Sequence, residues 1–593
     1  MYYPTIYGGY IDIYSHIMMI LLDIELIMYY PISDMSTIIK KIKKGHPYYY
    51  AVESARVSGK PRIVWQKYLG TLDSILQRLD QTKPAAPKEA VLFEAGGIAA
   101  LLRMAQRLKV IDLIDECVPK RKQGPSVGHY MALAALNRAL APCSKLAIGE
   151  WYEQTILRRL WRYPKSAFSS QRFWDHMDLM SEEVIERVEE ELVRRVEREF
   201  GLDSRVLLYD TTNFFTFLAT SNERANLPAR GNSKAKRHDL RQVGLALMVT
   251  REDQIPVLHH VYEGNIPDVT LFPMISRRLV ERFKKVVGDL REATLVFDKG
   301  NVSEEAMERL VVEGVHFIAA LSANRVPELF PVSNDRFTDI PELPGTRAYS
   351  TRIPIWGQEC RAIVVYTENF FTQQLYGVTQ NLVRCQKKLA DLKQRLSKKP
   401  NRGRRPTEGN LRQQIQKILS VQFMADVLKV TIRKEGPWLD ISYRVDHSVL
   451  RKLSNERLGK TVLVTNQLEW TPRQTIETYR HLASIEEAFK NMKNLHFLRW
   501  QPAFHWMDQK LRVHGFYCVL ALLLCSLAHK TVGEAGVHIT IPALLKELSS
   551  IREVALFYPS ETPIKCHITL SRMSLRQKKL TELLEVQEIL AGG

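Results

Sequence analysis

The chain has 593 residues, more than a single hydrophobic core usually contains, so we expect several domains. Its 84 Lys and Arg outnumber 65 Asp and Glu, which gives a net charge of +19, and its hydrophobic content is 45%. These values, with seven scattered cysteines and no Cys-x-x-Cys pair, exclude an intrinsically disordered chain, a disulfide framework and a zinc knuckle.

Residues 1–34 differ in composition from the rest of the chain. No Lys or Arg occurs before Lys40, although about one residue in seven is basic in the whole sequence. A more ordinary sequence begins at Met35. We therefore expect residues 1–34 to be an upstream reading extension, and a genuine N-terminal helix is the alternative.

Two apolar stretches are long enough to be considered as membrane segments. The first, residues 17–32, contains Asp23 and Glu25, is short for a span and lacks the basic start of a signal peptide. The second, residues 515–528, has a length typical of a buried core helix. We therefore expect a reduced, cytoplasmic protein without a membrane segment.

The chain before residue 201 divides into two parts. Residues 35–85 form a small basic module whose apolar and aromatic runs at 48–52 and 62–70 predict strands. In residues 86–200, apolar side chains recur every three or four positions, which predicts helices. A helical block on a basic chain could bind DNA ends, and a plain packing domain is the alternative.

The pattern changes in residues 201–322, the first part of the predicted core. Three β-branched and aromatic runs predict strands at 205–217, 243–250 and 257–263. They are followed by alternating helices and strands, at 270–287, 293–297, from Glu304 onward, and 317–322. This order predicts an α/β fold, in which helices pack on a mixed sheet.

Residues 323–460 are predicted to be an insertion into this sheet. Most of the regular structure predicted there is β, with strands at 353–356, 361–366, 427–432 and 439–443 and one charged helical segment. Residues 384–417 form a basic arm, with twelve Lys and Arg against Asp391 and Glu408, so that its net charge is +10. We expect this arm to contact nucleic-acid phosphates, and a solvated charged segment is the alternative.

Residues 461–530 return the chain to the core, and residues 531–593 form a C-terminal region. The run 460–465 predicts a last strand, and residues 471–474 have the N-cap, the proline and the glutamine of a helix start. Trp470 precedes this helix. We expect it to pack or cap, and stacking on an unpaired base is the alternative.

Asp210 and Asp298 are the first two acidic residues that we single out. Asp210 lies within an apolar strand, where burying a carboxylate is costly unless a cation or hydrogen bonds compensate. Asp298 follows a short strand and precedes a turn, and the carboxyl ends of strands are where α/β sheets place ligands. Each could be a structural residue, and together they could converge on a metal ion.

A third acid lies on the helix that begins after Thr471. At about 100° per residue, one face of this helix lies within roughly 40° of Glu486, while Glu487 points about 100° away. The residues that share this face with Glu486 are Tyr479, Leu482, Lys490 and Lys493. We therefore select Glu486, and an ordinary amphipathic helix with surface Glu–Lys pairs is the alternative.

Asp210, Asp298 and Glu486, with the spacing Tyr479-x6-Glu486-x6-Lys493, resemble the DDE transposases of bacterial insertion sequences. The most similar group is the insertion sequence 4 superfamily, in particular its insertion sequence 1634 branch, with the signature Tyr-x2-Arg-x3-Glu-x6-Lys. Two further motifs carry the resemblance, namely Gly231-x2-Lys234-x2-Arg237-x-Asp239-Leu240-Arg241-Gln242-Val243-Gly244-Leu245 and Tyr262-x-Gly264-Asn265.

The chain departs from this signature at one position. Leu482 stands where the family has arginine, and Arg480 lies at a different helical angle. The resemblance implies a ribonuclease H-like core interrupted by a mostly β insertion, with helical N-terminal and C-terminal regions. It also implies a DNA enzyme of the cytoplasm, associated with the nucleoid, that works as a homodimer pairing two ends.

The resemblance further implies that Asp210, Asp298 and Glu486 are both the catalytic and the metal-binding residues, with Mg²⁺ or Mn²⁺ as cofactor. Carboxylates without His or Cys suit such hard cations. The implied reaction is cleavage at the terminal inverted repeats followed by strand transfer to target DNA. The residues expected to bind DNA are Tyr479, Lys490, Lys493, Lys387, Lys388, Arg402, Arg404 and Arg405.

Two other functions remain open at this point. The first is a ribonuclease H-like nuclease that cuts DNA without strand transfer. The second is a degenerate DNA-binding protein without activity, an interpretation that Leu482 favours and the three acids oppose.

Overall fold

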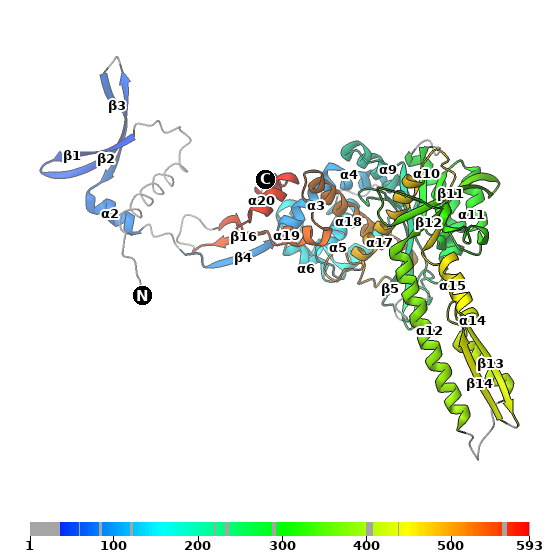
Figure 1. Ribbon diagram of the computed structural model, residues 1–593. Coiled ribbons are helices and arrows are strands. Elements are labelled where there is room, and N and C mark those ends of the chain that lie inside the picture. The colour runs from blue at the N-terminus through cyan, green and yellow to red at the C-terminus, as the bar shows by residue number, and fades with distance from the viewer. Residues whose placement is uncertain are drawn as a thin grey trace, which may run out of the picture. The chain divides into compact units, whose positions relative to one another are not determined.

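A computed structural model describes residues 36–57, 60–81, 86–118, 123–218, 221–231, 237–287, 292–398, 407–436, 438–559 and 566–591 (Figure 1). The extension predicted at residues 1–34 lies outside these ranges. The chain divides into two compact units. Unit 1 comprises Met1–Ala90 and Ala555–His567, and unit 2 comprises Val91–Val554 and Ile568–Gly593.

Unit 1 contains a three-stranded antiparallel sheet. Its strands are β1 (Ser36–Lys43), β2 (His46–Val57) and β3 (Lys60–Gly70), in the order β1-β2-β3. The helix α2 (Leu72–Gln81) packs against β2 and β3. Gly45 closes the turn between β1 and β2 with φ +79°, a backbone conformation that favours glycine. The strands predicted in residues 35–85 are therefore present.

Unit 2 begins with the helical region that the periodicity predicts. After β4 (Glu89–Glu94), the helices α3, α4, α5, α6, α7, α8 and α9 span Gly96–Arg107, Val110–Cys117, Val127–Leu140, Ile148–Glu153, Leu157–Trp161, Ser170–Met177 and Glu182–Phe200. Ser126, Ser169 and Ser181 cap α5, α8 and α9 by accepting a backbone N–H with their side chains. The apolar faces of these helices belong to the largest core cluster.

A nine-stranded sheet forms the centre of unit 2. Its strands are β5 (Val206–Thr216), β6 (Arg241–Thr250), β7 (Pro256–Glu263), β8 (Thr294–Phe297), β9 (His316–Leu321), β10 (Thr338–Asp339), β11 (Thr346–Ile355), β12 (Gln358–Thr367) and β15 (Lys460–Thr465). Their order is β10-β11-β12-β15-β9-β8-β5-β6-β7. The pairs β5–β8 and β8–β9 are parallel, and the other pairs are antiparallel.

Helices cover both faces of this sheet. Alternate residues of a strand point to opposite faces, so Leu207 and Tyr209 belong to one core cluster and Leu208 and Phe214 to another. The cluster of Leu207 includes apolar residues of α10 (Asp268–Val287) and α11 (Glu304–Val312). The opposite face packs with α17 (Leu482–Met492) and α18 (Asp508–Glu534).

The helix α18 is the central core helix. By length and composition it is the one described helix that could cross a membrane, but 94% of its most apolar window is buried inside the protein. This agrees with the core helix predicted at residues 515–528.

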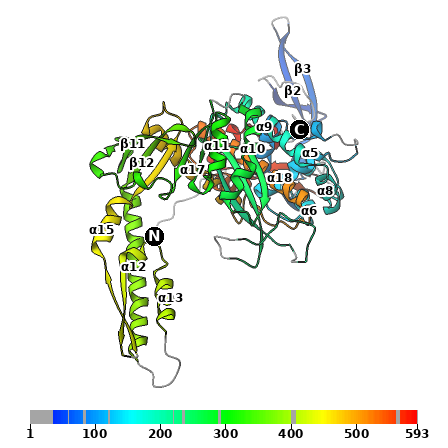
Figure 2. The same cartoon turned by 90° about the vertical axis from the view of Figure 1, so that its right-hand side faces the viewer.

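The insertion differs from the prediction, because it is not mostly β. Besides β10 to β12 it contains a hairpin of β13 (Leu428–Glu435) and β14 (Trp438–Val445). It also contains the helices α12 (Glu368–Ser397), α13 (Glu408–Leu419), α14 (Met424–Val427) and α15 (His447–Glu456). The helix α12 has 30 residues and runs along the hairpin (Figures 1 and 2). Together they form a projecting arm, residues 368–459, which contains the basic arm 384–417. The buried residues Val378, Cys385, Leu389 and Leu392 give this arm a core of its own.

Both ends of the arm lie at the sheet. The arm leaves from β12 and returns through β15, which pair with each other antiparallel. At its base the Thr367 N–H donates to the Gly459 carbonyl over 3.1 Å. The arm is thus an insertion between two neighbouring strands.

The C-terminal region also departs from the prediction, because it is not only helical. The helices α19 (Ile541–Ser549), α20 (Leu575–Leu583) and α21 (Gln587–Ala591) are present. Between them lie β16 (Arg552–Phe557) and β17 (Cys566–Leu570), in a sheet of order β17-β16-β4. The first and last parts of the chain therefore share a sheet, a pairing that sequence periodicity cannot reveal.

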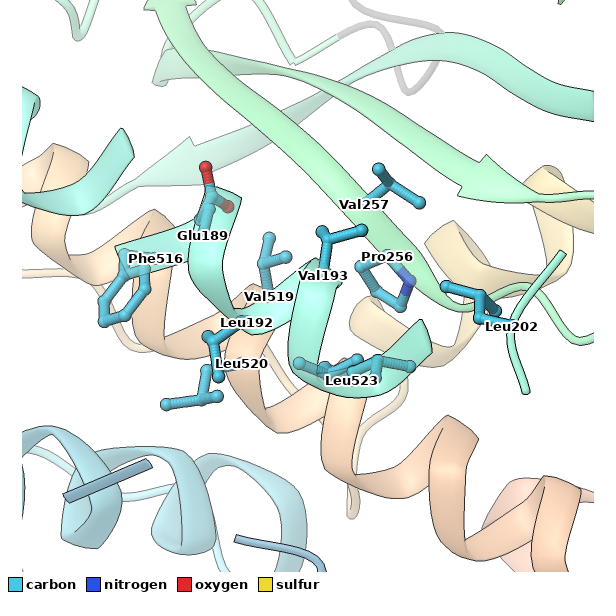
Figure 3. A pocket seen from close by; sticks show the side chains of 11 residues that line it. Glu189, Leu192, Val193, Leu202, Pro256, Val257, Phe516, Val519, Leu520 and Leu523 are labelled. Carbon is cyan, nitrogen blue, oxygen red and sulfur yellow. The ribbon is translucent and has the colours of Figure 1, made fainter. Parts of the chain in front are cut away.

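A small apolar pocket lies where α9, β7 and α18 meet (Figure 3). Its walls are aliphatic and aromatic except for the carboxylate of Glu189 at one end. Eleven residues line the pocket, and none of them is a predicted site residue. We therefore regard it as a packing feature of the seam between the helical region and the sheet.

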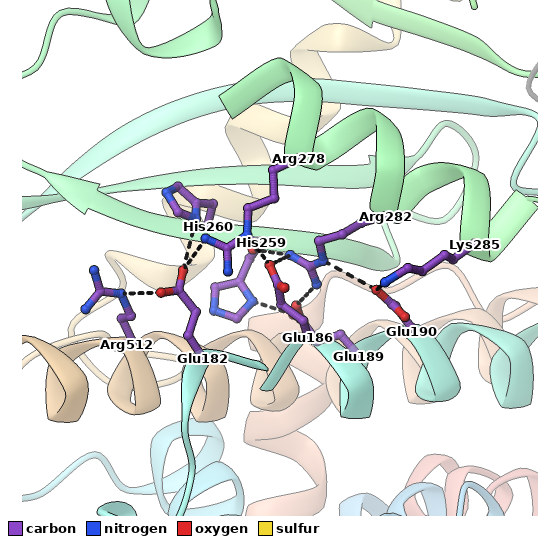
Figure 4. Close-up of polar contacts among 10 residues, drawn as sticks. All are labelled: Glu182, Glu186, Glu189, Glu190, His259, His260, Arg278, Arg282, Lys285 and Arg512. Carbon is purple, nitrogen blue, oxygen red and sulfur yellow. Dashed lines mark hydrogen bonds and ion pairs between the residues drawn. The ribbon is translucent and has the colours of Figure 1, made fainter. Parts of the chain in front are cut away.

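An ion-pair network joins α9 to β7, α10 and α18 beside this pocket (Figure 4). The buried Glu189 pairs with Arg282 at 2.6 Å and also contacts His259. Burial alone would raise the pKa of Glu189, but His259 and Arg282 outweigh it, so that the pKa is lowered. Losing one partner of such a pair would leave an uncompensated buried charge.

His260 is the acid-sensitive member of this network. Burial, together with the cations Arg278, Arg282 and Arg512, lowers its pKa to about 3. His260 is therefore neutral at neutral pH, so its 3.8 Å approach to Glu182 is not an ion pair there.

We expect acid to destabilise unit 2 through His260. Between a pH of about 6.5 and 3 the unfolded state binds a proton that folded His260 does not, so stability falls as the pH falls. From pH 6.5 to pH 5 this amounts to about 2 kcal/mol. The measurement compares urea unfolding at both pH values for the wild type and for His260→Asn, in which the loss should shrink. The exposed His538 provides the control variant, His538→Asn, and an equal loss in wild type and His260→Asn would contradict the prediction.

Candidate active site

The sheet brings Asp210 and Asp298 together. The strands β5 and β8 pair in parallel, and their last pair is Tyr209 with Phe297. Asp210 directly follows Tyr209, and Asp298 directly follows Phe297. The two aspartates therefore lie side by side where β8 ends. Both follow the alternation of Leu208 and therefore lie on the sheet face that α17 covers. Both side chains are half-buried.

Tyr479 connects this pair to α16 (Pro472–Arg480), the helix before α17. Its hydroxyl donates to Asp298 Oδ1 over 3.0 Å, and the Lys299 N–H donates to the same oxygen over 2.7 Å. Burial, followed by the charges of Asp298 and Asp210, raises the pKa of Tyr479 well above its usual value. The tyrosine is therefore a neutral hydrogen-bond donor at neutral pH.

Local interactions fix the start of α16. Thr471 and Gln474 form the capping box that the sequence predicts. Arg361 on β12 donates to the carbonyls of Leu468 and Trp470 and so holds the preceding loop against the sheet. Trp470 is half-buried against the core, in agreement with its expected packing role.

The single helix predicted from Thr471 onward is two helices, because α16 ends at Arg480 and α17 begins at Leu482. The first and last residues predicted to share the face of Glu486 nevertheless contact the sheet region. Tyr479 lies seven residues before Glu486 and contacts Asp298. Lys493 lies seven residues after it, where α17 ends, and donates to Thr212 Oγ1 over 2.5 Å. Glu486 therefore lies on α17 between two contacts with the strands that carry the aspartates, and its side chain is exposed.

The neighbouring acid lies on a different face. Glu487 pairs with Lys490 at 3.5 Å, and both side chains are mostly exposed. Lys490 thus contacts the neighbouring acid, whereas Tyr479 contacts Asp298 and Lys493 contacts Thr212.

Leu482, at the position where arginine was expected, is part of the core. It is 9% exposed and belongs to the cluster beneath α17. Arg480 does not replace the missing guanidinium, because it donates to Thr346 Oγ1 on β11 over 2.6 Å.

The donor chemistry of the site fits a hard divalent cation, since two carboxylates lie side by side with hydroxyl groups near them. Within the described ranges, however, no group of three or more His, Cys, Asp and Glu side chains lies close enough to hold a metal ion. The structure thus brings the two aspartates together, and Glu486 does not complete a three-carboxylate cluster with them.

Comparison with known proteins gives the family of this chain. The family described as the transposase DDE domain matches residues 202–503, slightly more than half of the chain. The chain belongs to this family. No curated protein matches it. Among solved structures, a piggyBac transposase synaptic complex with hairpin DNA is similar over 76% of this chain and 79% of that chain, with 10% identity and a TM-score of 0.34. A TM-score this low does not establish a shared fold.

The matched transposase domain includes β5, β8, the whole insertion and α17. All three predicted acids and the arm therefore lie inside it. Lys387 and Lys388 are exposed on α12, whereas Arg402, Arg404 and Arg405 lie outside the described residues. In the described part of the chain the arm lysines do not reach the aspartate site through any hydrogen bond or ion pair.

The two glycine motifs of the transposase domain meet each other. Gln242 donates to the Gly264 carbonyl over 2.7 Å, and a Cβ on Gly264 would lie 1.9 Å from the Gln242 carbonyl oxygen. A Cβ on Gly244 would lie 2.2 Å from the ring of Tyr262. These glycines are required for close approach between β6 and β7, so their role is structural.

Sequence reasoning missed two residues that shape the site. Thr212 follows Asp210 by two positions, so strand alternation places it on the same face, and this signal was available. Arg361 gave no signal, because its partners are backbone carbonyls more than a hundred residues away.

We expect Leu482 and Glu486 to differ in their effect on stability. Leu482→Ala removes a buried side chain and should lower the free energy of unfolding by about 2–4 kcal/mol. Glu486→Ala changes an exposed position and should shift it by less than about 0.5 kcal/mol. Thermal and urea unfolding of both variants measure this difference. Equal losses would show that Glu486 is part of the packing.

Proposed function

We propose that this protein is a DNA transposase that cleaves DNA strands at insertion-sequence ends and transfers them to target DNA. The observation that carries the proposal is the pairing of Asp210 with Asp298 beside two successive helices, α16 with Tyr479 and α17 with Glu486, after which Lys493 follows. Membership in the transposase DDE domain family supports it. The finer assignment to the insertion sequence 4 superfamily and its insertion sequence 1634 branch rests on the spacing in α16 and α17.

The strand order supports a ribonuclease H-like core. From β5 to β9, three antiparallel strands in succession are followed by two that run parallel to the first, in the spatial order third, second, first, fourth, fifth. In this proposal β10 to β12 and β15 extend the core sheet, and the arm is inserted between them.

In the proposed site, Asp210, Asp298 and Glu486 would hold Mg²⁺ or Mn²⁺. Two such ions would stabilise the attacking and leaving oxygens of an in-line displacement at phosphorus. Asp210 and Asp298 occupy neighbouring positions and would supply two of the ligands. Glu486, exposed on α17 between the contacts of Tyr479 and Lys493, would supply the third.

The other residues position these groups. The Tyr479 hydroxyl donates a hydrogen bond to Asp298 Oδ1. Its raised pKa keeps the hydroxyl protonated, so the orientation of this carboxylate does not depend on pH in the neutral range. Lys493 lies over the ring of Phe214 at 5.3 Å and next to Thr212, where its ammonium group can meet a phosphate beside Asp210. Lys490 adds an exposed positive charge one turn earlier.

DNA is the proposed partner, both as terminal inverted repeats and as target. The basic arm, with Lys387 and Lys388 exposed on α12, supplies phosphate contacts away from the acids. A homodimer that pairs two ends in the nucleoid-containing cytoplasm completes the proposal. A nuclease without strand transfer would cut element ends but would not join them to a target plasmid. A degenerate DNA-binding protein would do neither.

We expect each acid to be required for cleavage. Asp210→Asn, Asp298→Asn and Glu486→Gln should each lower Mg²⁺-dependent nicking of labelled element ends by at least about 10²-fold, because each removes a ligand of the cation. DNA binding should be largely retained. Glu487→Gln is the matched control, since its carboxylate already pairs with Lys490. Normal nicking by Glu486→Gln, or lost nicking by Glu487→Gln, would show that the wrong acid was selected.

We expect the lysines of α17 to act through phosphate charge. Lys490→Ala and Lys493→Ala should each weaken DNA binding and make the dependence of log K on log salt concentration less steep by about 0.9. Fluorescence anisotropy at several salt concentrations measures this slope. A slope equal to that of the wild type would mean that these lysines do not contact the backbone.

A further inference from the structure

The sheet of unit 1 has a closed face and an open face. On the closed face, the rings of Tyr50 and Tyr68 lie 5.2 Å apart and those of Tyr48 and Tyr68 lie 6.1 Å apart. The ammonium group of Lys41 lies 4.9 Å from the centre of the Tyr50 ring. Val52, on the same face, is 1% exposed. These rings, Lys41 and Val52 therefore pack on one another, although Tyr68 remains 53% exposed.

The opposite face has no comparable packing among the described residues. The strand register places Ile38, Ala51 and Lys67 in one row across the three strands, with Lys40 opposite Tyr49 and Trp65 opposite Glu53. Ile42 follows on β1 by the same alternation. We call these eight residues the open face. Three of its large apolar side chains are strongly exposed: Ile38 at 62%, Ile42 at 71% and Trp65 at 45%.

The charge around this face selects the kind of partner. Residues 36–81 contain nine basic residues, Lys40, Lys41, Lys43, Lys44, Arg56, Lys60, Arg62, Lys67 and Arg78, and three acidic ones, Glu53, Asp73 and Asp80. Nine minus three gives a net charge of +6. Exposed apolar side chains that lie together on a folded unit mark an interaction site. On the open face itself Lys40 and Lys67 outnumber Glu53, so a second copy of this face would bring lysines together, whereas a polyanion would pair with them.

The dimensions of the sheet fit duplex DNA. Neighbouring strands lie about 4.8 Å apart, so the outer strands β1 and β3 are separated by roughly 10 Å. The major groove of B-DNA is about 12 Å wide and admits β-structure. On the open face, lysines alternate with apolar side chains along β1 and β3, which suits contact with phosphates and with base edges, including thymine methyl groups.

We propose that the open face of unit 1 docks in the major groove of duplex DNA, with Lys40 and Lys67 on phosphates and Ile38, Ile42 and Trp65 against base edges. This inference rests on the proposed transposase function, because it assigns to unit 1 part of the DNA contact that the function requires. It adds a second DNA contact, in a different unit from the aspartate site.

The test uses the full-length protein and a labelled 30-base-pair duplex. Lys40→Ala/Lys67→Ala should weaken binding and make the dependence of log K on log salt less steep by about 1.8, or 0.9 for each lost phosphate contact. Lys546→Ala/Lys578→Ala is the matched control, since it removes the same charge from exposed positions on α19 and α20 and should leave the slope unchanged. Ile38→Thr/Ile42→Thr should weaken binding while the slope stays that of the wild type. Equal thermal midpoints confirm that the variants are folded.

Three outcomes would overturn the inference. The first is an unchanged slope for Lys40→Ala/Lys67→Ala. The second is preference of the wild type for single-stranded DNA or anionic phospholipid vesicles, with that preference lost in the open-face variants. The third is a sedimentation change in Ile38→Thr/Ile42→Thr without any change in DNA affinity, which would make the face a contact between copies.

Nicking of a supercoiled plasmid separates this inference from the proposed function. If the wild type nicks DNA and Asp210→Asn does not, the function stands, and open-face variants that bind normally overturn the inference alone. If the wild type neither binds nor nicks DNA, both fall.

Discussion

The parallel pairing of β5 with β8 is the constraint on which the site depends. Both strands are buried, so their register is set by the apolar side chains that alternate between two core clusters. A slip of one residue would move Asp210 to the opposite face and force the apolar side chains beside it into the wrong core cluster. The packing of Leu207, Leu208 and Tyr209 therefore fixes where the carboxylate lies. Asp298 follows directly, because β8 ends at Phe297 in the same register.

The helices α16 and α17 depend on this pair in turn. Tyr479 near the end of α16 contacts Asp298, and Lys493 directly after α17 contacts Thr212, so that both helices are attached to the sheet region. Arg361 on β12 holds the loop before α16 by donating to the carbonyls of Leu468 and Trp470, and so fixes where α16 begins. As a result the segment that carries Glu486 is held at both ends, while the glutamate between them remains exposed to solvent.

Much of the core was predictable from local patterns. The strand at 460–465 agrees with the prediction residue for residue, and the capping box at Thr471 is present, because both depend on near neighbours. The proximity of Asp210 and Asp298 was also predictable, since one lies in a strand and the other directly after a strand of the same sheet. By contrast, the sequence does not show that Glu486 stays apart from the aspartates, since that depends on how far α17 sits from the sheet.

In the insertion, the four predicted strands fall on β11, β12, β13 and β14, and the extent of the helices was underestimated. The residues that bury α12 within the arm are Val378, Cys385, Leu389 and Leu392, at spacings of seven, four and three, which is a helical pattern. The pairing of β16 with β4 was missed because partners so far apart in sequence leave no local signal.

The base of the arm has a consequence for how this domain can vary. Thr367 and Gly459 are hydrogen-bonded neighbours at the ends of two paired strands. The residues between them therefore form a cassette, a segment that leaves the sheet and returns to it at the same place. A cassette of this kind can lengthen, shorten or be exchanged for a tight turn while the sheet keeps its path. Evolution can therefore modify the arm independently of the carboxylates that the sheet brings together.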